Sequence, residues 1–194
     1  MSDPYQVVRD FEAALCEYTG ARYAVAVNSC SSAILLSCAG FPETTVQVPN
    51  NTYCSVPNSV MLAWHNVEFV HMEWSGAYQL NPLPVWDSAR RFTGSMYRAG
   101  QFQCVSFQTS KILGLEQGGA ILHDNQEADS WLRRARFDGR LDASEKLPRQ
   151  RGWHCYMNPS TAALGLQRLA CLPRDNPDQC GWESFADLSE LDLW

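Results

Sequence analysis

The sequence predicts an α/β layer architecture with a mostly parallel β-sheet, and three observations support this class. Short apolar runs typical of strands alternate along the chain with segments of helical periodicity. Apolar residues make up 45% of the chain, which is enough to build a full core. A length of 194 residues favours one domain with at most a short appendage.

Five segments have the periodicity and the end signals of helices. In the first, Asp3 can cap the helix, Pro4 suits its first position, and Gly20 is a natural stop. The others follow serine or asparagine residues and repeat apolar side chains at helical spacing. We expect helices from Pro4 to Gly20, from Ala33 to near Gly40, from Ser55 to Trp64, from Asn125 to Arg136, and from Asn158 through Leu169.

Six short apolar runs lie between or beside these helices and are expected to be strands. They are Tyr23–Val27, Val46–Val48, Val67–Val70, Pro84–Trp86, Phe102–Phe107 and Ala120–Leu122. Because strands and helices alternate, the sheet is expected to be largely parallel.

Composition excludes several classes of protein. The net charge of −6 argues against general nucleic-acid binding, which needs a basic surface. No apolar run approaches the roughly 20 residues that cross a membrane. The opening residues lack the basic and then apolar order of a signal peptide. We therefore expect a cytoplasmic protein that binds neither nucleic acid nor membrane.

Eight cysteines are many for that compartment, but their spacing does not indicate a metal site. No two of them form a Cys-x-x-Cys pair, and no histidine-rich spacing accompanies them. We interpret them as reduced, mostly buried thiols that act as small hydrophobes. Cys171 and Cys180 could pair in an oxidising setting, although nothing requires it.

Charge is distributed unevenly along the second half of the chain. Residues 131–151 hold seven arginines or lysines against three acidic residues, whereas residues 174–194 are acidic and rich in Asp and Trp. The simpler interpretation, which we favour slightly, is a solvated face followed by a loosely packed tail. The alternative is a basic rim for a phosphorylated or nucleotide-bearing ligand.

Polar residues follow two of the expected strands and could bind a ligand. Ser29-Cys30-Ser31-Ser32 lies between a strand and a helix, where backbone N–H groups and the helix dipole favour an anion. Asp87 ends a short apolar strand, and ligands of parallel sheets bind at strand carboxyl ends. Simple helix capping explains either segment equally well when each is considered alone.

A lysine and two glycines follow a third strand. Lys111 comes after Ser106 at the end of residues 102–107, and a partly desolvated lysine there can act as a nucleophile. A solvated surface lysine is the ordinary alternative. Gly118-Gly119 precedes the next strand, where glycine lets the backbone turn tightly or approach a neighbour closely.

Together these features match the needs of pyridoxal 5′-phosphate. Its phosphate suits a helix N-terminus, its pyridine nitrogen suits an aspartate that keeps it protonated, and its aldehyde suits a lysine. The order of the motifs along the chain also resembles that of the DegT/StrS sugar aminotransferases, within the fold-type I aminotransferase superfamily. The motifs that carry this resemblance are Asn28–Ile34, Val48–Tyr53, Val85–Ala89, Ser106–Lys111, Arg136–Gly139 and Gly152–Leu169.

The resemblance implies a role for each matched position. Lys111 would bond covalently to the cofactor aldehyde and later move the proton, and Asp87 would pair with the pyridine nitrogen. Tyr53 would stack on the ring. The phosphate would be held by Ser31, the backbone at Cys30, the hydroxyl of Ser106 and, from the neighbouring subunit of a homodimer, His154. Arg90 stands where the family usually has Gln or His beside the cofactor hydroxyl.

Several positions depart from the family pattern. Cys30 replaces a glycine, Gln117 replaces the glutamate of Glu-Gly-Gly, and His154 replaces an asparagine. The connection from Met72 to Pro84 is short. The resemblance therefore implies a reduced three-layer large domain at residues 1–170, with the C-terminal small domain largely missing and a short acidic tail at residues 171–194.

The leading hypothesis is a pyridoxal-phosphate-dependent aminotransferase that acts on a nucleotide-linked keto sugar, with an amino acid such as glutamate as donor. The alternative is a catalytically impaired remnant that binds the cofactor or another ligand and has a regulatory or structural role. A third, weaker hypothesis is a phosphate-binding α/β domain without pyridoxal phosphate.

Overall fold

The computed structural model describes residues 3–193 and contains five α-helices and seven strands within them. The helices are α1 (Gln6–Thr19), α2 (Cys30–Ala39), α3 (Ser55–Leu62), α4 (Gln126–Ala135) and α5 (Pro159–Cys171). The strands are β1 (Tyr23–Val27), β2 (Thr45–Pro49), β3 (Asn66–Val70), β4 (Tyr78–Gln79), β5 (Val85–Asp87), β6 (Phe102–Ser106) and β7 (Gly119–His123). Two short 3₁₀ helices, Trp182–Ser184 and Leu188–Glu190, lie near the C-terminus.

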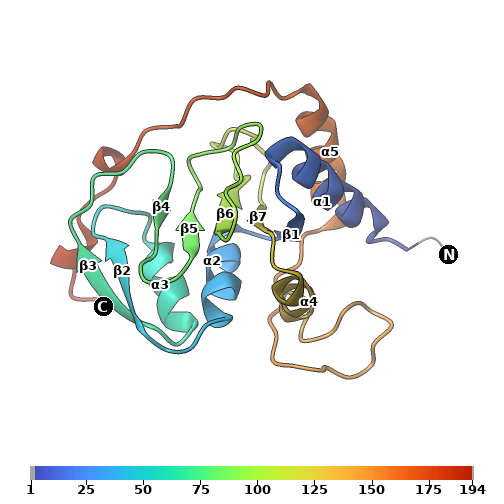
Figure 1. The fold of residues 1–194 in the computed structure, drawn as a ribbon, viewed down its shortest axis with the longest axis horizontal. Helices are drawn as coiled ribbons and strands as arrows, with labels where there is room; N and C mark the ends of the chain where they lie inside the picture. Colours follow the sequence, from blue (N-terminus) through green and yellow to red (C-terminus); the bar gives the residue numbers. More distant parts are fainter. Residues whose placement is uncertain (1–2, 194) are drawn as a thin grey trace.

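The main sheet has five strands in the order β1-β7-β6-β5-β4, and β2 and β3 form a separate parallel pair (Figure 1). The α/β class is confirmed, but the main sheet is mixed. Strands β1, β5 and β6 run in one direction, whereas β7 and β4 run in the other. The reversal at β7 follows from the connection after β6, because residues 107–118 contain no helix that could carry the chain back for a parallel pairing.

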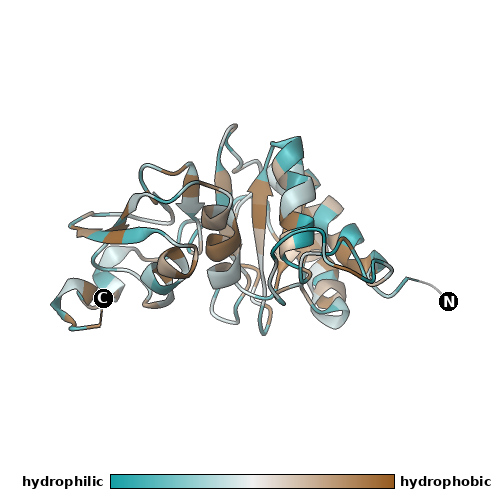
Figure 2. Cartoon of the chain, turned by 90° about the horizontal axis from the view of Figure 1, so that it is seen from below, coloured by the Kyte–Doolittle hydropathy of each residue, from teal (hydrophilic) through white to brown (hydrophobic). Residues whose placement is uncertain are grey.

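Helices cover both faces of this sheet and make three layers. Along β1, the alternate residues Val25 and Val27 pack into one apolar cluster, and Ala24 and Ala26 pack into another. The first cluster contains the inner sides of α2, α3 and α4, and the second contains those of α1 and α5. Figure 2 shows the apolar strands in the middle of the molecule, between these helices.

Capping residues fix the helix ends, mostly as expected. Asn125 and Asn158 accept hydrogen bonds from backbone N–H groups of the first turns of α4 and α5, and Gly20 ends α1 in the left-handed conformation. The start of α1 was predicted too early: the helix begins at Gln6, and Asp3 instead accepts a hydrogen bond from the backbone N–H of Tyr5.

The segment after α5, residues 172–193, is here called the C-terminal strap. Figure 1 shows it in red, running from α5 past the edge of the sheet towards β2 and β3. Asp178 forms an ion pair with Arg91 at 2.5 Å, and the amide of Asn50 donates to Asp187 at 2.5 Å. The indole N–H of Trp74 donates to the backbone oxygen of Asn51, and the side-chain amide of Asn51 donates to the backbone oxygen of Phe185. The expectation of a loosely packed tail is therefore wrong for these residues.

The cysteines and the basic segment also have defined places. All eight cysteines are free thiols; three are buried, but Cys54, Cys171 and Cys180 are exposed, so the expectation of mostly buried thiols holds only in part. The arginines of residues 131–151 pair largely with acidic partners, as Arg133 and Arg136 do with the buried Glu12. Across residues 3–193, no helix is both long and apolar enough to span a bilayer, and no three-residue cluster suits a metal ion.

Candidate active site

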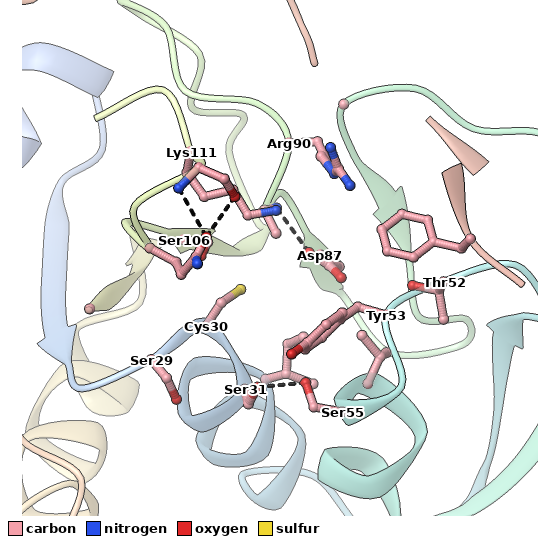
Figure 3. A pocket seen from close by; sticks show the side chains of 18 of the residues that line it. Ser29, Cys30, Ser31, Thr52, Tyr53, Ser55, Asp87, Arg90, Ser106 and Lys111 are labelled. Carbon is pink, nitrogen blue, oxygen red and sulfur yellow. Dashed lines mark hydrogen bonds between the residues drawn. The ribbon is translucent and has the colours of Figure 1, made fainter. Parts of the chain in front are cut away.

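One cavity of about 420 Å³ opens where β1, β5 and β6 end and β7 begins. Its volume is within the range typical of small-molecule sites. Seven of the eight predicted site residues line it, and they come from four separate parts of the chain (Figure 3). These residues are Cys30, Ser31, Tyr53, Asp87, Arg90, Ser106 and Lys111.

The N-terminus of α2 forms one end of the cavity. Ser29 caps the helix through the backbone N–H of Ser32, and the Ser31 hydroxyl lies 2.6 Å from that of Ser55. A Cβ atom at Gly119 would lie 2.7 Å from the backbone nitrogen of Cys30, so only glycine lets β7 approach the helix this closely. Hydroxyls and free helical N–H groups therefore face one small region, an arrangement that suits an anion.

The thiol of Cys30 is directed at the sheet rather than at that anion region. Its Sγ lies 3.5 Å from the backbone oxygen of Cys104. Burial raises its pKa well above the usual range, with further increases from the neighbouring Asp87 and Cys104, so the thiol stays protonated at neutral pH. Cys30 stands where the family has a glycine, and its side chain fits because the sulfur lies between α2 and β6.

Asp87 is a buried carboxylate at the end of β5. It accepts hydrogen bonds from the Tyr78 hydroxyl at 2.8 Å and from the backbone N–H of Ala89 at 2.9 Å. Burial raises its pKa, and these hydrogen bonds together with the charges of Lys111 and Arg90 oppose that rise. A cation placed against Asp87 would favour its ionised form.

Lys111 is half-buried and reaches into the same cavity (Figure 3). Burial lowers its pKa, and the nearby Arg90 lowers it further, while the charge of Asp87 acts in the opposite direction. A larger fraction of its amino groups is therefore neutral at a given pH than in a solvated lysine, and the neutral amine is the nucleophilic form. Lys111 therefore lies in the cavity with a lowered pKa, and its role as a nucleophile stays a prediction.

The other predicted residues complete the walls, except for one. Ser106 is buried beside Gly119, its partner in the β6–β7 ladder, and Tyr53 is exposed at the cavity mouth. His154 lies outside the cavity on an exposed site, where its Nδ1 is 3.1 Å from Asp138. Its expected place in the cavity of a neighbouring subunit stays a prediction.

Sequence reasoning missed several residues that shape the cavity. Tyr78 and Thr52 form a buried chain to Asp87, with their hydroxyl oxygens 2.5 Å apart. Ser55 was read only as a helix start, although it also contacts Ser31. Phe185 of the C-terminal strap lines the cavity from the far end of the chain. Of these residues, only Thr52 and Ser55 could have been predicted from the sequence, because both are hydroxyl residues close to the predicted site residue Tyr53.

Solved structures of other proteins share this fold. Helicobacter pylori PseC, an aminotransferase involved in the biosynthesis of pseudoaminic acid, has a TM-score of 0.72 at 18% identity, covering 85% of this chain and 57% of its own. NtdA of Bacillus subtilis, solved with bound cofactor PMP, has a TM-score of 0.68 at 18% identity, covering 86% and 48%. The fold is that of the large domain of fold-type I pyridoxal-phosphate-dependent transferases, as expected.

Sequence comparison then assigns the family. The pattern of the DegT/DnrJ/EryC1/StrS aminotransferase family matches residues 1–85 and 87–179, and this chain belongs to that family. A UDP-4-amino-4,6-dideoxy-N-acetyl-beta-L-altrosamine transaminase of Campylobacter jejuni is 24% identical, over 84% of this chain and 56% of its own length. The chain thus spans a little over half the length of the curated relatives it matches.

The cavity fits pyridoxal 5′-phosphate, the cofactor expected from sequence and confirmed by family membership. The fit lies in the donor set: a half-buried lysine amine, a buried carboxylate, and hydroxyls at a helix N-terminus all line one cavity of suitable volume. Each of these groups answers one chemical need of the cofactor, namely its aldehyde, its pyridine nitrogen and its phosphate.

Proposed function

We propose that this chain binds pyridoxal 5′-phosphate through Lys111 and transfers an amino group from an amino acid such as glutamate to a keto sugar carried on a nucleotide. The observation that carries the proposal is the convergence of Lys111, Asp87 and the Ser31–Ser55 pair on one cavity. Membership of an aminotransferase family and similarity to a transaminase named for a UDP-sugar support the reaction type and the substrate class.

Each residue has a defined task in this proposal. Lys111 Nζ would hold the cofactor through its aldehyde and would carry the proton to and from the reacting carbon. Asp87 holds a proton on the pyridine nitrogen, and Tyr78 keeps the carboxylate oriented by its hydrogen bond. Bound pyridoxal phosphate supplies an electron sink for the bonds that break at the substrate carbon.

The residues at the α2 end hold the phosphate. The Ser31, Ser55 and Ser106 hydroxyls, which line the cavity, and the first backbone N–H groups of α2 would donate to its oxygens. Tyr53, which is exposed at the mouth, would cover the cofactor ring and exclude water once the site is filled. These contacts use groups that already face the cavity.

The overall exchange balances without any added oxidant or reductant. The amino acid loses its C–N bond and the C–H bond on the same carbon, and it leaves as a 2-keto acid whose keto oxygen comes from water; this is a two-electron oxidation. The keto sugar exchanges its carbonyl oxygen for the amino group and gains a C–H bond on that carbon, with loss of one water; this is the matching two-electron reduction. Lys111 returns to its starting state, and the cofactor serves both halves of the reaction.

A half-reaction separates this proposal from the alternative of an impaired binding remnant. Wild-type protein is loaded with pyridoxal phosphate, and the absorbance band of the lysine-bound cofactor is followed after L-glutamate is added. Loss of the band, with formation of 2-oxoglutarate, supports the transaminase. A band that forms but does not respond to glutamate or to other amino acids supports the remnant.

We further propose a cytoplasmic homodimer in which His154 of one subunit reaches the phosphate in the other. The side chain of His154 is exposed, and it contacts Asp138 at 3.1 Å and the ring of Tyr156 at 4.8 Å between centroids, so it could reach a neighbouring subunit. Sedimentation of the loaded protein tests the dimer. Mixing the Lys111→Ala and His154→Ala variants tests the shared site, because hybrid dimers would regain one intact cavity.

A further inference from the structure

Arg90 has a buried nitrogen that lacks a hydrogen-bond partner. Its Nε is shielded from solvent and unpaired within residues 3–193. Its terminal nitrogens contact a thiol and a hydroxyl rather than a carboxylate, at 3.1 Å to Cys180 Sγ and 3.4 Å to Ser184 Oγ. A guanidinium bound in this way lacks the anionic partner that such groups normally have when they are partly buried.

The cavity as a whole has more cationic than anionic groups. Arg90 and Lys111 are its two basic side chains, and Asp87 is the single carboxylate that lines it. Neither basic residue forms an ion pair within the described part of the chain, whereas the adjacent Arg91 is paired with Asp178. A ligand with negative charge near Arg90 would supply the missing partner.

This anion cannot be the cofactor phosphate. Figure 3 shows Arg90 on the opposite side of Asp87 from the Ser31–Ser55 pair, where the phosphate is expected. Arg90 and Lys111 instead line the same cavity, and Figure 3 shows both on the side of Asp87 away from the Ser31–Ser55 pair. The carboxylate of an amino acid is joined to the carbon that bears the amino group, so an anion held here keeps that amino group next to the lysine.

A nucleotide diphosphate fits this position less well. In a nucleotide-linked sugar the diphosphate lies several bonds from the carbon to be aminated, whereas Arg90 is beside the lysine at which the chemistry occurs. The planar guanidinium also matches a carboxylate through two parallel hydrogen bonds. Distance and shape both favour the carboxylate.

The C-terminal strap holds the guanidinium in place. The Phe185 ring lies 5.0 Å from the guanidinium carbon of Arg90, and the backbone N–H of Gln179 donates to the Arg90 carbonyl at 2.9 Å. The amide of Gln179 also donates to the carbonyl of Ser110, next to Lys111. The strap therefore connects Arg90 to the loop that carries the lysine.

We infer that Arg90, oriented by the C-terminal strap, binds the α-carboxylate of the amino-acid donor and of the 2-keto acid product. This inference rests on the proposed function and assigns its donor subsite. Arg90 thus sets which amines can react: those with a carboxylate on the reacting carbon are held beside Lys111, and simple amines are not.

The test compares Arg90→Gln with Arg98→Gln, which removes the same charge from an exposed site. Loaded proteins are titrated calorimetrically with glutarate, a dicarboxylate that has no amino group to react. They are then mixed with L-glutamate or with 4-aminobutyrate, which lacks the α-carboxylate. Arg90→Gln should weaken glutarate binding about 10- to 100-fold, the range for a lost charge-assisted pair. It should raise the half-saturating glutamate concentration, relative to that of 4-aminobutyrate, by a similar factor.

Three outcomes decide the matter. Selective loss for glutarate and glutamate in Arg90→Gln, with Arg98→Gln like wild type, supports the inference. Equal effects on glutamate and 4-aminobutyrate, or no effect on glutarate, overturn it. Weaker binding of UDP with unchanged binding of glutarate would assign Arg90 to a diphosphate and also overturn it. If wild type never forms the band of lysine-bound cofactor, the proposed function itself has failed, and circular dichroism checks that each variant is folded.

Discussion

Replacement of Tyr78 by phenylalanine tests the buried chain that orients Asp87. The phenol has one proton, which it donates to Asp87 at 2.8 Å, so the Thr52 hydroxyl must donate to the phenol oxygen at 2.5 Å. Tyr78→Phe keeps the ring and its packing against Trp74, at 4.8 Å between centroids, but removes both hydrogen bonds. Asp87 and Thr52 are then left buried with one partner fewer each.

The size of the effect follows from these two losses. A hydrogen bond to a carboxylate contributes about 1.5–3 kcal/mol, and a neutral one about 1 kcal/mol. The free energy of unfolding should therefore fall by about 2–4 kcal/mol, which lowers Tm by about 5–15 °C in a chain of this size. The hydrogen bond from Tyr78 lowers the pKa of Asp87, so its loss should raise that pKa further. As the pH is lowered, Asp87 of the variant should become protonated first, and the variant should lose cofactor affinity at a higher pH than wild type does.

Urea unfolding and cofactor titration across pH measure both effects. Tyr23→Phe is the matched control, because Tyr23 stacks on His123 and its hydroxyl has no hydrogen-bond partner among residues 3–193; it should change stability by less than about 0.5 kcal/mol. A Tyr78→Phe protein as stable as that control, with an unchanged pH profile, would refute this account of Asp87.

Three further perturbations give distinct results. Gly119→Ala should lower the free energy of unfolding by about 1–3 kcal/mol and weaken phosphate binding, because the new Cβ would lie 2.7 Å from the Cys30 nitrogen. A variant with the thermal stability of wild type would show that β7 and α2 are not so closely packed. Glu12→Gln should cost about 3–5 kcal/mol in chemical denaturation, because Arg133 and Arg136 both pair with this buried carboxylate, and a loss below about 1 kcal/mol would contradict that. Arg90→Gln should shift the pH profile of cofactor attachment to higher pH, because the Arg90 charge lowers the pKa of Lys111; stopped-flow absorbance that shows no shift, or a shift to lower pH, would disprove this coupling.

The helices and most strands were predictable because their signals are local. Apolar periodicity and the caps Asn125 and Asn158 place α4 and α5 within about two residues. The convergence of Ser31, Asp87 and Ser106 on one cavity could also be predicted, since each lies at or just after the end of a strand and these strands end at the same edge of the sheet.

Features that depend on distant contacts were not predictable in the same way. Residues 107–118 have no helical pattern, which favours the antiparallel β6–β7 pairing. The alternation of strands and helices in the rest of the chain favours a parallel sheet, and it led to the wrong prediction for this pair. Tyr78 has no local mark of its bond to Asp87, and β4 has only two residues. The C-terminal strap reads as polar and irregular because its order comes from partners such as Arg91, Asn50 and Trp74.

The most direct test of the central claim is to trap the cofactor on its lysine. The chain has two lysines, Lys111 in the cavity and Lys146 on an exposed loop, so each serves as the control for the other. Protein mixed with pyridoxal 5′-phosphate is reduced with borohydride, digested and analysed by peptide mass spectrometry. We predict one pyridoxyl group per chain, on Lys111, which is lost in Lys111→Ala and retained in Lys146→Ala. Labelling of Lys146 alone, or equal labelling of both lysines at limiting cofactor, would contradict the account.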